Sequence, residues 1–492
     1  MTEHRESFAP GEGSPDSRRW LILGVVALAQ LMVVLDASIV NIALPSAQKA
    51  LGFSTGDRQW IVTGYSLAFA SLLLLGGRLS DIVGRKRMFI TGLIGFAGAS
   101  AVGGASTDFA MLVSARALQG GFGAMLAPAA LSTLTTTFTR PDERRKAFGI
   151  WGAVSGGGAA VGLLLGGALT EYLSWRWCLY VNVLLAVVSL AGAVTLLQHR
   201  PDDAPRPRMD IAGAVLAAGG LFCIVFGFSR AETNGWLDGE TLGFLAGGVA
   251  LVAAFVVHQS QSDHPLLPLR IVIDRTRGGS YLAILLSAMG MFGVFLFLTY
   301  YLQSIQGYSA LKTGLAFLPM VAALMATAQI SSQLLSRRVG SKWLVMAGML
   351  AAGVGMVVLA QISVTSSYLS PVLPGVLCIG VGLGLIFASA MNQGTAGLGG
   401  ADAGVGSATV STMQQLGGSI GTSLLNTLAA SATATYLTSH GTRAVVSANV
   451  HGFVTAFWWS AGIFVVGALV AAVLLPGRVT ALPTEESAAI AA

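Results

Sequence analysis

The strongest constraint on this chain is a series of continuous apolar blocks, each long enough to cross a lipid bilayer as one helix. A helix of ~20 residues matches the ~30 Å hydrocarbon core of a bilayer. Because the blocks do not alternate apolar with polar residues, they exclude a transmembrane barrel. The sequence therefore predicts an all-α membrane protein with about fourteen transmembrane helices, at residues 20–44, 58–79, 88–105, 109–137, 147–169, 177–197, 210–229, 241–259, 278–302, 313–335, 343–362, 371–391, 404–430 and 453–476.

The composition and the charge distribution agree with a membrane location. Of 492 residues, 54% are hydrophobic and only 10% charged, and the mean hydropathy is +0.72, far above the balance of soluble domains. The net charge is +6, which raises the question of nucleic acid as a partner. When the N-terminus is placed in the cytoplasm, however, most of the 28 lysines and arginines fall on that side, as the positive-inside rule requires. We expect a multi-pass protein of the cell membrane with both termini cytoplasmic, the lipid bilayer as a partner, and no nucleic acid.

Ordinary enzyme chemistry has no visible site in this sequence. It contains no phosphate-binding Gly-rich loop with Lys-Ser/Thr, no His-Glu metal helix and no Ser nucleophile elbow, the motifs that would mark such chemistry. Cys178, Cys223 and Cys378 all fall in apolar blocks without paired or metal-ligand spacing, which favours packing roles. Residues 1–17 lack the pattern of a cleaved secretory signal. We expect no enzyme activity, no cofactor and no metal site.

Two loops indicate an internal duplication. GRLSDIVGRK at 77–86 and QLLSRRVGSK at 333–342 share Leu, Ser, Val, Gly and Lys in a gapless alignment. A chance match of two short basic turns is the alternative. Parallel repeats are typical of transporters that rock two bundles around a central site. The duplication predicts a cytoplasmic tail, a six-helix bundle, a linker with two inserted helices, a second six-helix bundle and a cytoplasmic tail, at 1–19, 20–197, 198–277, 278–476 and 477–492.

Five motifs carry a family resemblance that spans nearly the whole chain. In order they are LDASIVNIALP (35–45), GGRLSDIVGRKR (76–87), RALQGGFGA (116–124), GLLLGG (162–167) and WRWCLYVN (175–182). Together with the number of apolar blocks, they resemble the major facilitator superfamily, specifically its fourteen-helix drug:proton antiporter branch (the EmrB/QacA group). The resemblance implies two six-helix bundles plus two inserted central helices, and export of small molecules driven by protons.

Asp36 is the one acid clearly in the middle of a predicted helix. It stands in VVLDASIVNIALPS (33–46), and an ionised carboxylate at membrane depth costs ~2.5–3.5 kcal/mol on insertion scales, so such residues usually serve a function. Burial also favours the protonated form of an acid, which suits a group that binds and releases protons. The resemblance implies a transport role for Asp36. The alternative is an acid that never titrates because Ser38 or Asn41 hydrogen-bonds it.

Arg116 is the only basic residue well inside an apolar block. A buried guanidinium does not shed its proton and must be paired or hydrogen-bonded. The resemblance implies a part in proton transfer, in which a change in the distance between Arg116 and an acid releases or recaptures a proton. The alternative is an arginine held by helix carbonyls. The sequence does not show whether Arg116 and Asp36 approach one another.

The first copy of the duplicated loop predicts a gating element. Its glycines permit a tight turn and close helix approach, its aspartate offers a cap or ion-pair partner, and its basic residues suit lipid headgroups. The resemblance implies that the loop latches the cytoplasmic side as the bundles rock; a plain topology signal is the alternative. Arg337 replaces the aspartate in the second copy. The gating residues are Gly77, Asp81, Gly84, Arg85 and Lys86.

Small residues along 152–167 predict a helix face that another helix approaches closely. In the family's antiporter motif a proline follows the glycine that matches Gly162, whereas this chain has Leu163. The helix bend expected from proline is therefore not implied here, and the link between the motif and export is weaker. Plain packing is the alternative role. The motif glycines are Gly158, Gly162, Gly166 and Gly167.

A substrate pocket is expected, by analogy with the family, from the first, fourth, ninth and twelfth apolar blocks. Their aromatic, thioether and amide side chains suit a bulky, amphipathic small molecule, and aromatic faces also hold cations. Each residue has packing as its alternative role. The candidates are Gln30, Asn41, Gln119, Met291, Phe295, Tyr300, Tyr301, Asn392 and Gln393.

The resulting prediction is a proton-coupled multidrug or antibiotic efflux antiporter, with protons and a small amphipathic molecule as its partners. Coupling requires that proton and substrate binding depend on each other. Two alternatives remain: a metabolite importer or facilitator on the same fold, which Leu163 favours slightly, and a ligand-sensing membrane receptor, which the short polar tails disfavour.

Overall fold

The fold is built almost entirely from long helices, as predicted. The computed structural model describes residues 16–477 except 55–56, 139, 198–209, 263–264, 336–337, 397 and 399–400. The predicted linker at 199–208, Arg337 and most of the two predicted tails lie outside the described residues. Within the described part, extended structure is limited to isolated bridges around Ser367 and Ser370.

The helices of the first half pack on one another around α4. In this group α2 and α3 both lie against α4, while α1 lies against α5 and α6. Close approach is possible because small residues stand at the contacts: a Cβ added to Gly76 of α2 would meet the Ala124 carbonyl oxygen of α4 at 2.2 Å. The bounds are α1 (Asp16–Leu51), α2 (Gln59–Val83), α3 (Arg85–Gly104), α4 (Phe109–Thr137), α5 (Pro141–Tyr172) and α6 (Trp177–Leu196).

The helices of the second half form a similar group. Here α12 lies against α13 and α15, and α10 lies against α13, α14 and α15. The short α9 (Leu269–Val272) precedes this group, and two π-helical turns, η1 (Tyr301–Ile305) and η2 (Ser331–Leu335), extend two of its helices. The long helices are α10 (Arg275–Tyr300), α11 (Ala310–Ile330), α12 (Ser341–Leu359), α13 (Val372–Thr395), α14 (Ala401–His440) and α15 (Val445–Leu474).

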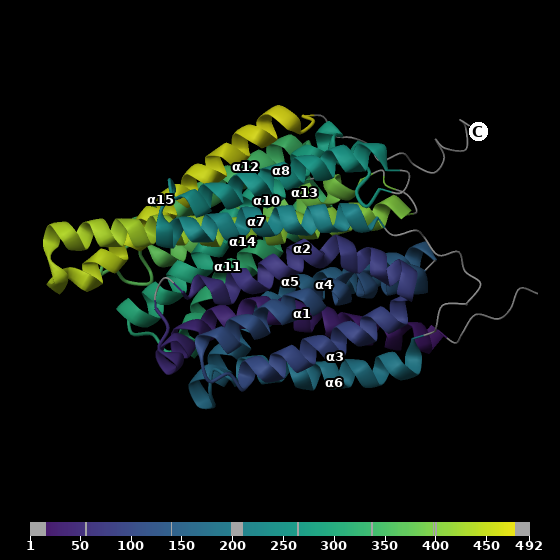
Figure 1. The fold of residues 1–492 in the computed structure, drawn as a ribbon, viewed down its shortest axis with the longest axis horizontal. Coiled ribbons are helices and arrows are strands. Elements are labelled where there is room, and N and C mark those ends of the chain that lie inside the picture. The colour runs from purple at the N-terminus through teal and green to yellow at the C-terminus, as the bar shows by residue number, and fades with distance from the viewer. Residues whose placement is uncertain are drawn as a thin grey trace, which may run out of the picture.

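Two further helices, α7 (Ile211–Asn234) and α8 (Gly239–Gln261), pack on each other between the two halves of the sequence. Only α7 also contacts α2 and α14, where Val225 joins Leu67 and Leu416 in a small apolar cluster. Figure 1 shows α7 alongside α14 and near α2. The halves meet most extensively where α2 lies against α14 and where α5 lies against α11, and the inserted pair packs beside the first of these contacts.

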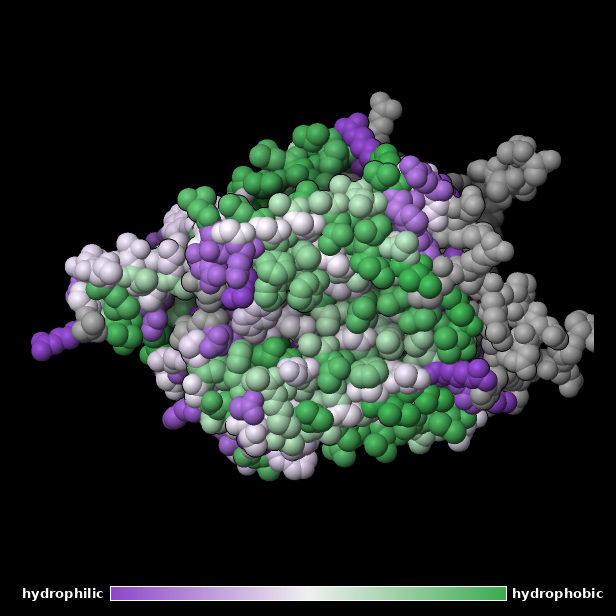
Figure 2. All heavy atoms as spheres, viewed as in Figure 1, coloured by the Kyte–Doolittle hydropathy of each residue, from purple (hydrophilic) through white to green (hydrophobic). Residues whose placement is uncertain are grey.

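The helices run roughly parallel to the long axis of the molecule, so the molecule has two distinct ends (Figure 1). We call the end where α1 begins and α15 finishes the terminal end. The other is the hairpin end, because α14 and α15 project there as a helical hairpin joined by the short η3 (Thr442–Ala444). Figure 2 shows hydrophobic residues over much of the middle of the visible face and hydrophilic residues gathered toward the ends.

The structure confirms an all-α membrane fold. Among the described residues, 11 helices are long and apolar enough to cross a membrane. The long helices α2, α5 and α14 also coincide with predicted blocks, but they are not among those 11. The full count of fourteen spans, and the domain boundaries drawn from the duplication, therefore remain predictions.

Candidate functional site

Asp36 and Arg116 form an ion pair in the interior of the first half. Asp36 lies on α1 and is 0% exposed, and Arg116 lies on α4 and is 2% exposed. The Arg116 Nη1 donates to Asp36 Oδ2 at 2.5 Å. The two charges therefore share one buried site, which the sequence alone did not establish.

Three more side chains complete a hydrogen-bonded network around the pair. Gln119 Nε2 donates to Asp36 Oδ1 at 3.1 Å and to the Ser100 hydroxyl of α3 at 2.7 Å, while its Oε1 accepts from Arg116 at 2.9 Å. Asn182 Nδ2, from α6, donates to Asp36 Oδ1 at 2.7 Å. The network thus joins α1, α3, α4 and α6.

The guanidinium of Arg116 has partners on α2 as well. Its Nε donates to the Ile61 carbonyl at 3.2 Å, and its central carbon lies 4.4 Å from the centroid of the Tyr65 ring. A buried ion pair needs such additional hydrogen bonds because desolvation otherwise exceeds the Coulombic gain. Arg116 is therefore held by Asp36 as well as by a carbonyl, an amide and an aromatic face.

The alternative partners considered for Asp36 are not its partners in the structure. The Ser38 hydroxyl donates to the carbonyls of Val34 and Leu35, and the Asn41 amide donates to the Ala37 carbonyl at 3.0 Å. Both side chains donate hydrogen bonds to backbone carbonyls of their own helix, α1. Asp36 instead accepts hydrogen bonds from other helices, so its environment depends on how those helices sit relative to α1.

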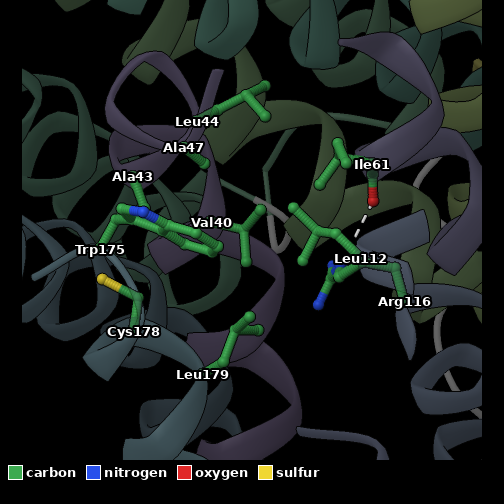
Figure 3. Close-up of a pocket in the computed structure, with 10 residues that line it drawn as sticks. All are labelled: Val40, Ala43, Leu44, Ala47, Ile61, Leu112, Arg116, Trp175, Cys178 and Leu179. Carbon is green, nitrogen blue, oxygen red and sulfur yellow. Dashed lines mark hydrogen bonds between the residues drawn. The ribbon is translucent and has the colours of Figure 1, made fainter. Parts of the chain in front are cut away.

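A small apolar cavity adjoins Arg116 (Figure 3). Its volume is about 10 Å³, about the minimum that holds one water molecule, so it is too small for a bulky substrate. None of the predicted substrate residues lines it. The lining comes from α1, α2, α4, α6 and Trp175 just before α6, and comprises Val40, Ala43, Leu44, Ala47, Ile61, Leu112, Arg116, Trp175, Cys178 and Leu179.

The predicted substrate residues are not gathered around one pocket. Gln119 belongs to the ion-pair network, and Asn41 donates a hydrogen bond to a backbone carbonyl of its own helix. Phe295 packs against Phe317, with the ring centroids 5.3 Å apart and the rings tilted by 33°. The remaining candidates are spread between buried, half-buried and exposed positions: Tyr301 is buried, Gln30, Met291 and Gln393 are half-buried, and Asn392 is exposed.

Tyr300 lies instead in a layer of polar contacts between the two halves near the hairpin end. Its hydroxyl donates to Gln48 Oε1 of α1 at 2.5 Å. The guanidinium carbon of Arg58 lies 4.2 Å from the Tyr300 ring centroid, and Arg58 Nη2 donates to Asn426 Oδ1 of α14 at 3.3 Å. The sequence did not mark Arg58, which is only 4% exposed, as a functional residue. Arg58 stands at the start of an apolar block, where a basic residue is interpreted as part of an external loop.

Two further contacts belong to the same layer. Gln303 Nε2 donates to the Ile42 carbonyl of α1 at 3.1 Å, and the Leu311 backbone N–H donates to Glu171 Oε2 at 3.0 Å. The layer therefore links α1 and α5 of the first half to η1 and α11 of the second.

The predicted gating loop forms a tight turn between α2 and α3. Gly84 has φ +100°, a left-handed value that side chains with a Cβ rarely adopt. Lys86 Nζ reaches across to donate to the Val194 carbonyl of α6 at 2.8 Å, Arg85 is exposed, and Gly77 lies next to Pro128 of α4. The side chain of Asp81 lies outside the described part of the structure, so its predicted ion pair is not tested.

The motif glycines of α5 contact two different neighbouring helices. A Cβ added to Gly162 would meet Ser38 Oγ at 2.0 Å, and one added to Gly166 would meet Ile39 Cγ1 at 2.7 Å; Gly158 faces Val34 of the same helix α1. Gly167 instead faces α11, where an added Cβ would lie 2.6 Å from Leu311 Cα.

Leu163 does not interrupt this helix. It is fully buried within a continuous α5. Its carbonyl oxygen lies against Gly314 of α11, because a Cβ added to Gly314 would be 2.5 Å from that oxygen. The same helix therefore contacts α1 through one face and the second half through another.

This structure packs many membrane-length helices around a buried, hydrogen-bonded ion pair. That combination is typical of membrane transporters, in which charged residues within the membrane mark transport pathways. A family model described as the Major Facilitator Superfamily matches residues 26–422. The chain therefore belongs to the Major Facilitator Superfamily, as the five motifs indicated.

Relatives of this chain are named for antibiotic resistance and export. The puromycin resistance protein of Streptomyces alboniger is 46% identical over 97% of this chain and 95% of its own length. The cephamycin export protein of Amycolatopsis lactamdurans is 38% identical over 88% and 90%. The tetracenomycin C resistance and export protein of Streptomyces glaucescens is 35% identical over 84% and 76%.

A solved structure has the same fold. It is a bacterial homologue of the human lysosomal transporter Spinster, crystallised in an inward-facing and unoccupied conformation. The two chains superpose with a TM-score of 0.67 at 15% sequence identity, over 94% of this chain and 98% of the other. Similarity at this level of identity supports the fold alone.

Proposed function

We propose that this protein is a proton-driven exporter of small amphipathic antibiotics, which alternates access between its two helical halves. The observation that carries the proposal is the buried Asp36–Arg116 pair, because a titratable acid held by a permanent cation is what proton coupling requires. Asp36 takes up a proton from outside and releases it to the cytoplasm, while the substrate moves outward.

The coupling follows from the geometry of the pair. Arg116 stays charged, so an ionised Asp36 is favoured while the two groups are in contact and disfavoured when they separate. The two residues lie on different helices, α1 and α4, and their network reaches α2, α3 and α6. A rearrangement of these helices therefore changes the proton affinity of Asp36, and by linkage protonation favours one arrangement.

The polar layer between the halves supplies an outer gate. With the terminal end in the cytoplasm, as the distribution of basic residues favours, the contacts of Tyr300 with Gln48 and of Gln303 with the Ile42 carbonyl lie on the outer side. These bonds hold the outer side closed, and they must break for substrate to leave. The turn at Gly84, with Asp81, Arg85 and Lys86, serves as the gating element on the cytoplasmic side.

The substrate class rests on the relatives and on the predicted lining. The relatives are named for puromycin, cephamycin and tetracenomycin C, which points to antibiotics for this chain. The predicted substrate residues Phe295, Asn392 and Gln393, all in the second half, would contact the substrate when the halves rearrange.

An importer on the same fold is the second candidate, and Leu163 favours it. The proline of the antiporter motif is absent, and α5 is continuous through this position. Direction of transport separates the two candidates, since exporter and importer move substrate oppositely with respect to the same membrane.

The test is uptake of labelled puromycin into everted membrane vesicles that contain the protein, under an imposed pH gradient with an acidic interior. We expect accumulation above that of vesicles lacking the protein, and its loss when a protonophore collapses the gradient. Gradient-driven depletion of preloaded vesicles would favour the importer. Accumulation that ignores the gradient would contradict proton coupling.

A further inference from the structure

Asn182 of α6 contacts the carboxylate of Asp36 directly, and the proposed mechanism has not used it. It is 0% exposed, and its Nδ2 donates to Asp36 Oδ1 at 2.7 Å. A hydrogen bond to an ionised acceptor is about twice as strong as one between neutral groups. Asn182 therefore favours the ionised form of Asp36 as long as the contact lasts.

The other end of the same amide is uncommitted. Asn182 Oδ1 is buried and has no hydrogen-bond partner among the described residues. Leaving a buried carbonyl oxygen without a partner is unfavourable, and such exceptions are rare in proteins. Because its donor is engaged and its acceptor is idle, the Asn182 oxygen is available to a donor that appears at the carboxylate.

The neighbouring amide does not have this freedom. Gln119 Oε1 accepts from Arg116 at 2.9 Å, and its Nε2 donates to Ser100 Oγ at 2.7 Å as well as to Asp36. Turning the Gln119 amide would break its bond to Arg116. Of the two amides on the carboxylate, only Asn182 has a spare acceptor.

We propose that Asn182 is a positioning residue that follows the charge of Asp36. Its Nδ2 donates to the ionised carboxylate, and when Asp36 takes up a proton the amide turns so that Oδ1 accepts from the new O–H. The turn needs only rotation about the last side-chain torsion, which is broad and nearly two-fold in asparagine. Asn182 itself neither gains nor loses a proton, and Arg116 keeps its charge. The inference rests on the proposed role of Asp36 as the coupling acid.

The other titratable groups facing Asp36 are Arg116 from α4, Tyr65 from α2 and Cys178 from α6. From α3 the network receives only the Ser100 hydroxyl. None of these groups duplicates the function of Asn182, because none of them both donates a hydrogen bond to the Asp36 carboxylate and has an acceptor atom without a partner.

The test is an infrared titration of the purified protein in lipid nanodiscs, following the C=O stretch of protonated Asp36, which Asp36→Asn identifies by its loss. In Asn182→Leu, a variant of similar shape without hydrogen-bonding groups, Asp36 should bind its proton about tenfold more tightly, because the ionised form loses a charge-assisted bond whereas the protonated form loses only a weaker neutral one. Asn41→Leu, the same change at a buried asparagine that does not contact Asp36, should leave the titration unchanged.

A second measurement follows the amide itself. With ¹³C in asparagine side chains, the Asn182 amide band, which Asn182→Leu identifies by its loss, should shift together with protonation of Asp36. An unaltered titration in Asn182→Leu, or an amide band that ignores Asp36, would overturn the inference and leave the proposed function intact. If no Asp36 band titrates in the unmodified protein, the proposed function fails with it.

Discussion

At the scale of single residues, the sequence allowed Asp36 to be predicted as a functional acid, but it did not allow its ion pair with Arg116 to be predicted. Asp36 was predictable because a carboxylate in an apolar run needs a reason. Its pairing with Arg116 was not, since the two residues are distant in the chain and meet only after α1 and α4 have packed. Asn182 was also missed, although an amide inside the apolar run 177–197 is a signal that could have marked it.

Removing one partner of the pair should cost more than removing both. We expect Arg116→Met to lower the free energy of unfolding by about 3–5 kcal/mol, because it leaves an uncompensated buried carboxylate. The double variant Asp36→Asn/Arg116→Met should be clearly more stable than Arg116→Met alone. Unfolding in mixed micelles measures these two variants together with Asp36→Asn alone, which gives the coupling between the sites. Additive losses would mean that the pair contributes nothing as a pair.

At the scale of helices, α5 carries the contacts that fix α1. Glycines at 158, 162 and 166 bring the two backbones together, and Asp36 lies on the same helix α1. A comparable face exists in the second half, where Cβ atoms added to Gly417 and Gly421 of α14 would meet the carbonyl oxygens of Leu285 and Met289 of α10 at 2.2 and 2.3 Å. The small-residue pattern made this packing predictable, but not which neighbour each glycine faces.

A pair of alanine substitutions tests the packing of α5. Gly162→Ala should destabilise the protein by about 1–3 kcal/mol, the usual cost of overpacking, because the new methyl group meets Ser38. Gly157→Ala, one turn earlier on the same helix, meets nothing within 4 Å and should be neutral or slightly stabilising. Melting temperatures in detergent compare the two variants. Equal losses in the two variants would show that contact with α1 does not decide the cost, since helix propensity favours alanine over glycine at both positions.

The inserted helix pair has its own polar junction at the terminal end. Asp210 caps α7 by accepting from the Gly213 N–H at 2.8 Å, and it also contacts His258 and Gln259 of α8, each at 2.7 Å. Burial alone would raise the pKa of the Asp210 carboxyl, but these hydrogen bonds and the His258 charge together lower it.

Because the pKa of Asp210 is lowered on folding, its ionised form stabilises the junction at pH values above ~3.9, the ordinary value of an aspartate, and this stabilisation is lost as pH falls through the folded pKa. We expect the protection factor for amide exchange at the start of α7, which corrects the exchange rate for its intrinsic pH dependence, to be constant from neutral pH down to about 4. Asp210→Ala should speed that exchange, while Asp210→Asn, which retains the cap, should speed it less. Exchange in Asp210→Asn equal to that of the unmodified protein would exclude a role for the charge, and equal exchange in the two variants would exclude a role for the cap.

At the scale of the whole molecule, the sequence predicted the fold class because membrane helices are long, continuous and apolar, and the duplicated loop indicated two related halves. The location of the substrate site was not predictable. The candidate residues were chosen one helix at a time, whereas a pocket depends on how far apart the two halves stand. In this arrangement Tyr300 donates a hydrogen bond to Gln48 across the halves and is not among the residues that line the cavity beside Arg116.

Linking the halves at the hairpin end should stop transport reversibly. Glu171 of α5 and the Leu311 backbone of α11 are 3.0 Å apart between Oε2 and N. In a chain with the native cysteines replaced by alanine, we expect Glu171→Cys/Leu311→Cys to lose substrate transport when a short thiol-reactive bridge joins the pair. Reduction of a cleavable bridge should restore it, and each single cysteine should be insensitive. Full transport by the bridged protein would rule out opening at this end.

The most direct test of the account compares two kinds of flux in proteoliposomes that contain the unmodified protein or Asp36→Asn. One is accumulation of puromycin driven by a pH gradient, and the other is exchange of labelled for unlabelled puromycin without a gradient. We predict that Asp36→Asn retains exchange and loses gradient-driven accumulation, because it still binds and moves substrate but no longer carries a proton. Accumulation by Asp36→Asn equal to that of the unmodified protein would contradict the central claim that Asp36 couples transport to protons.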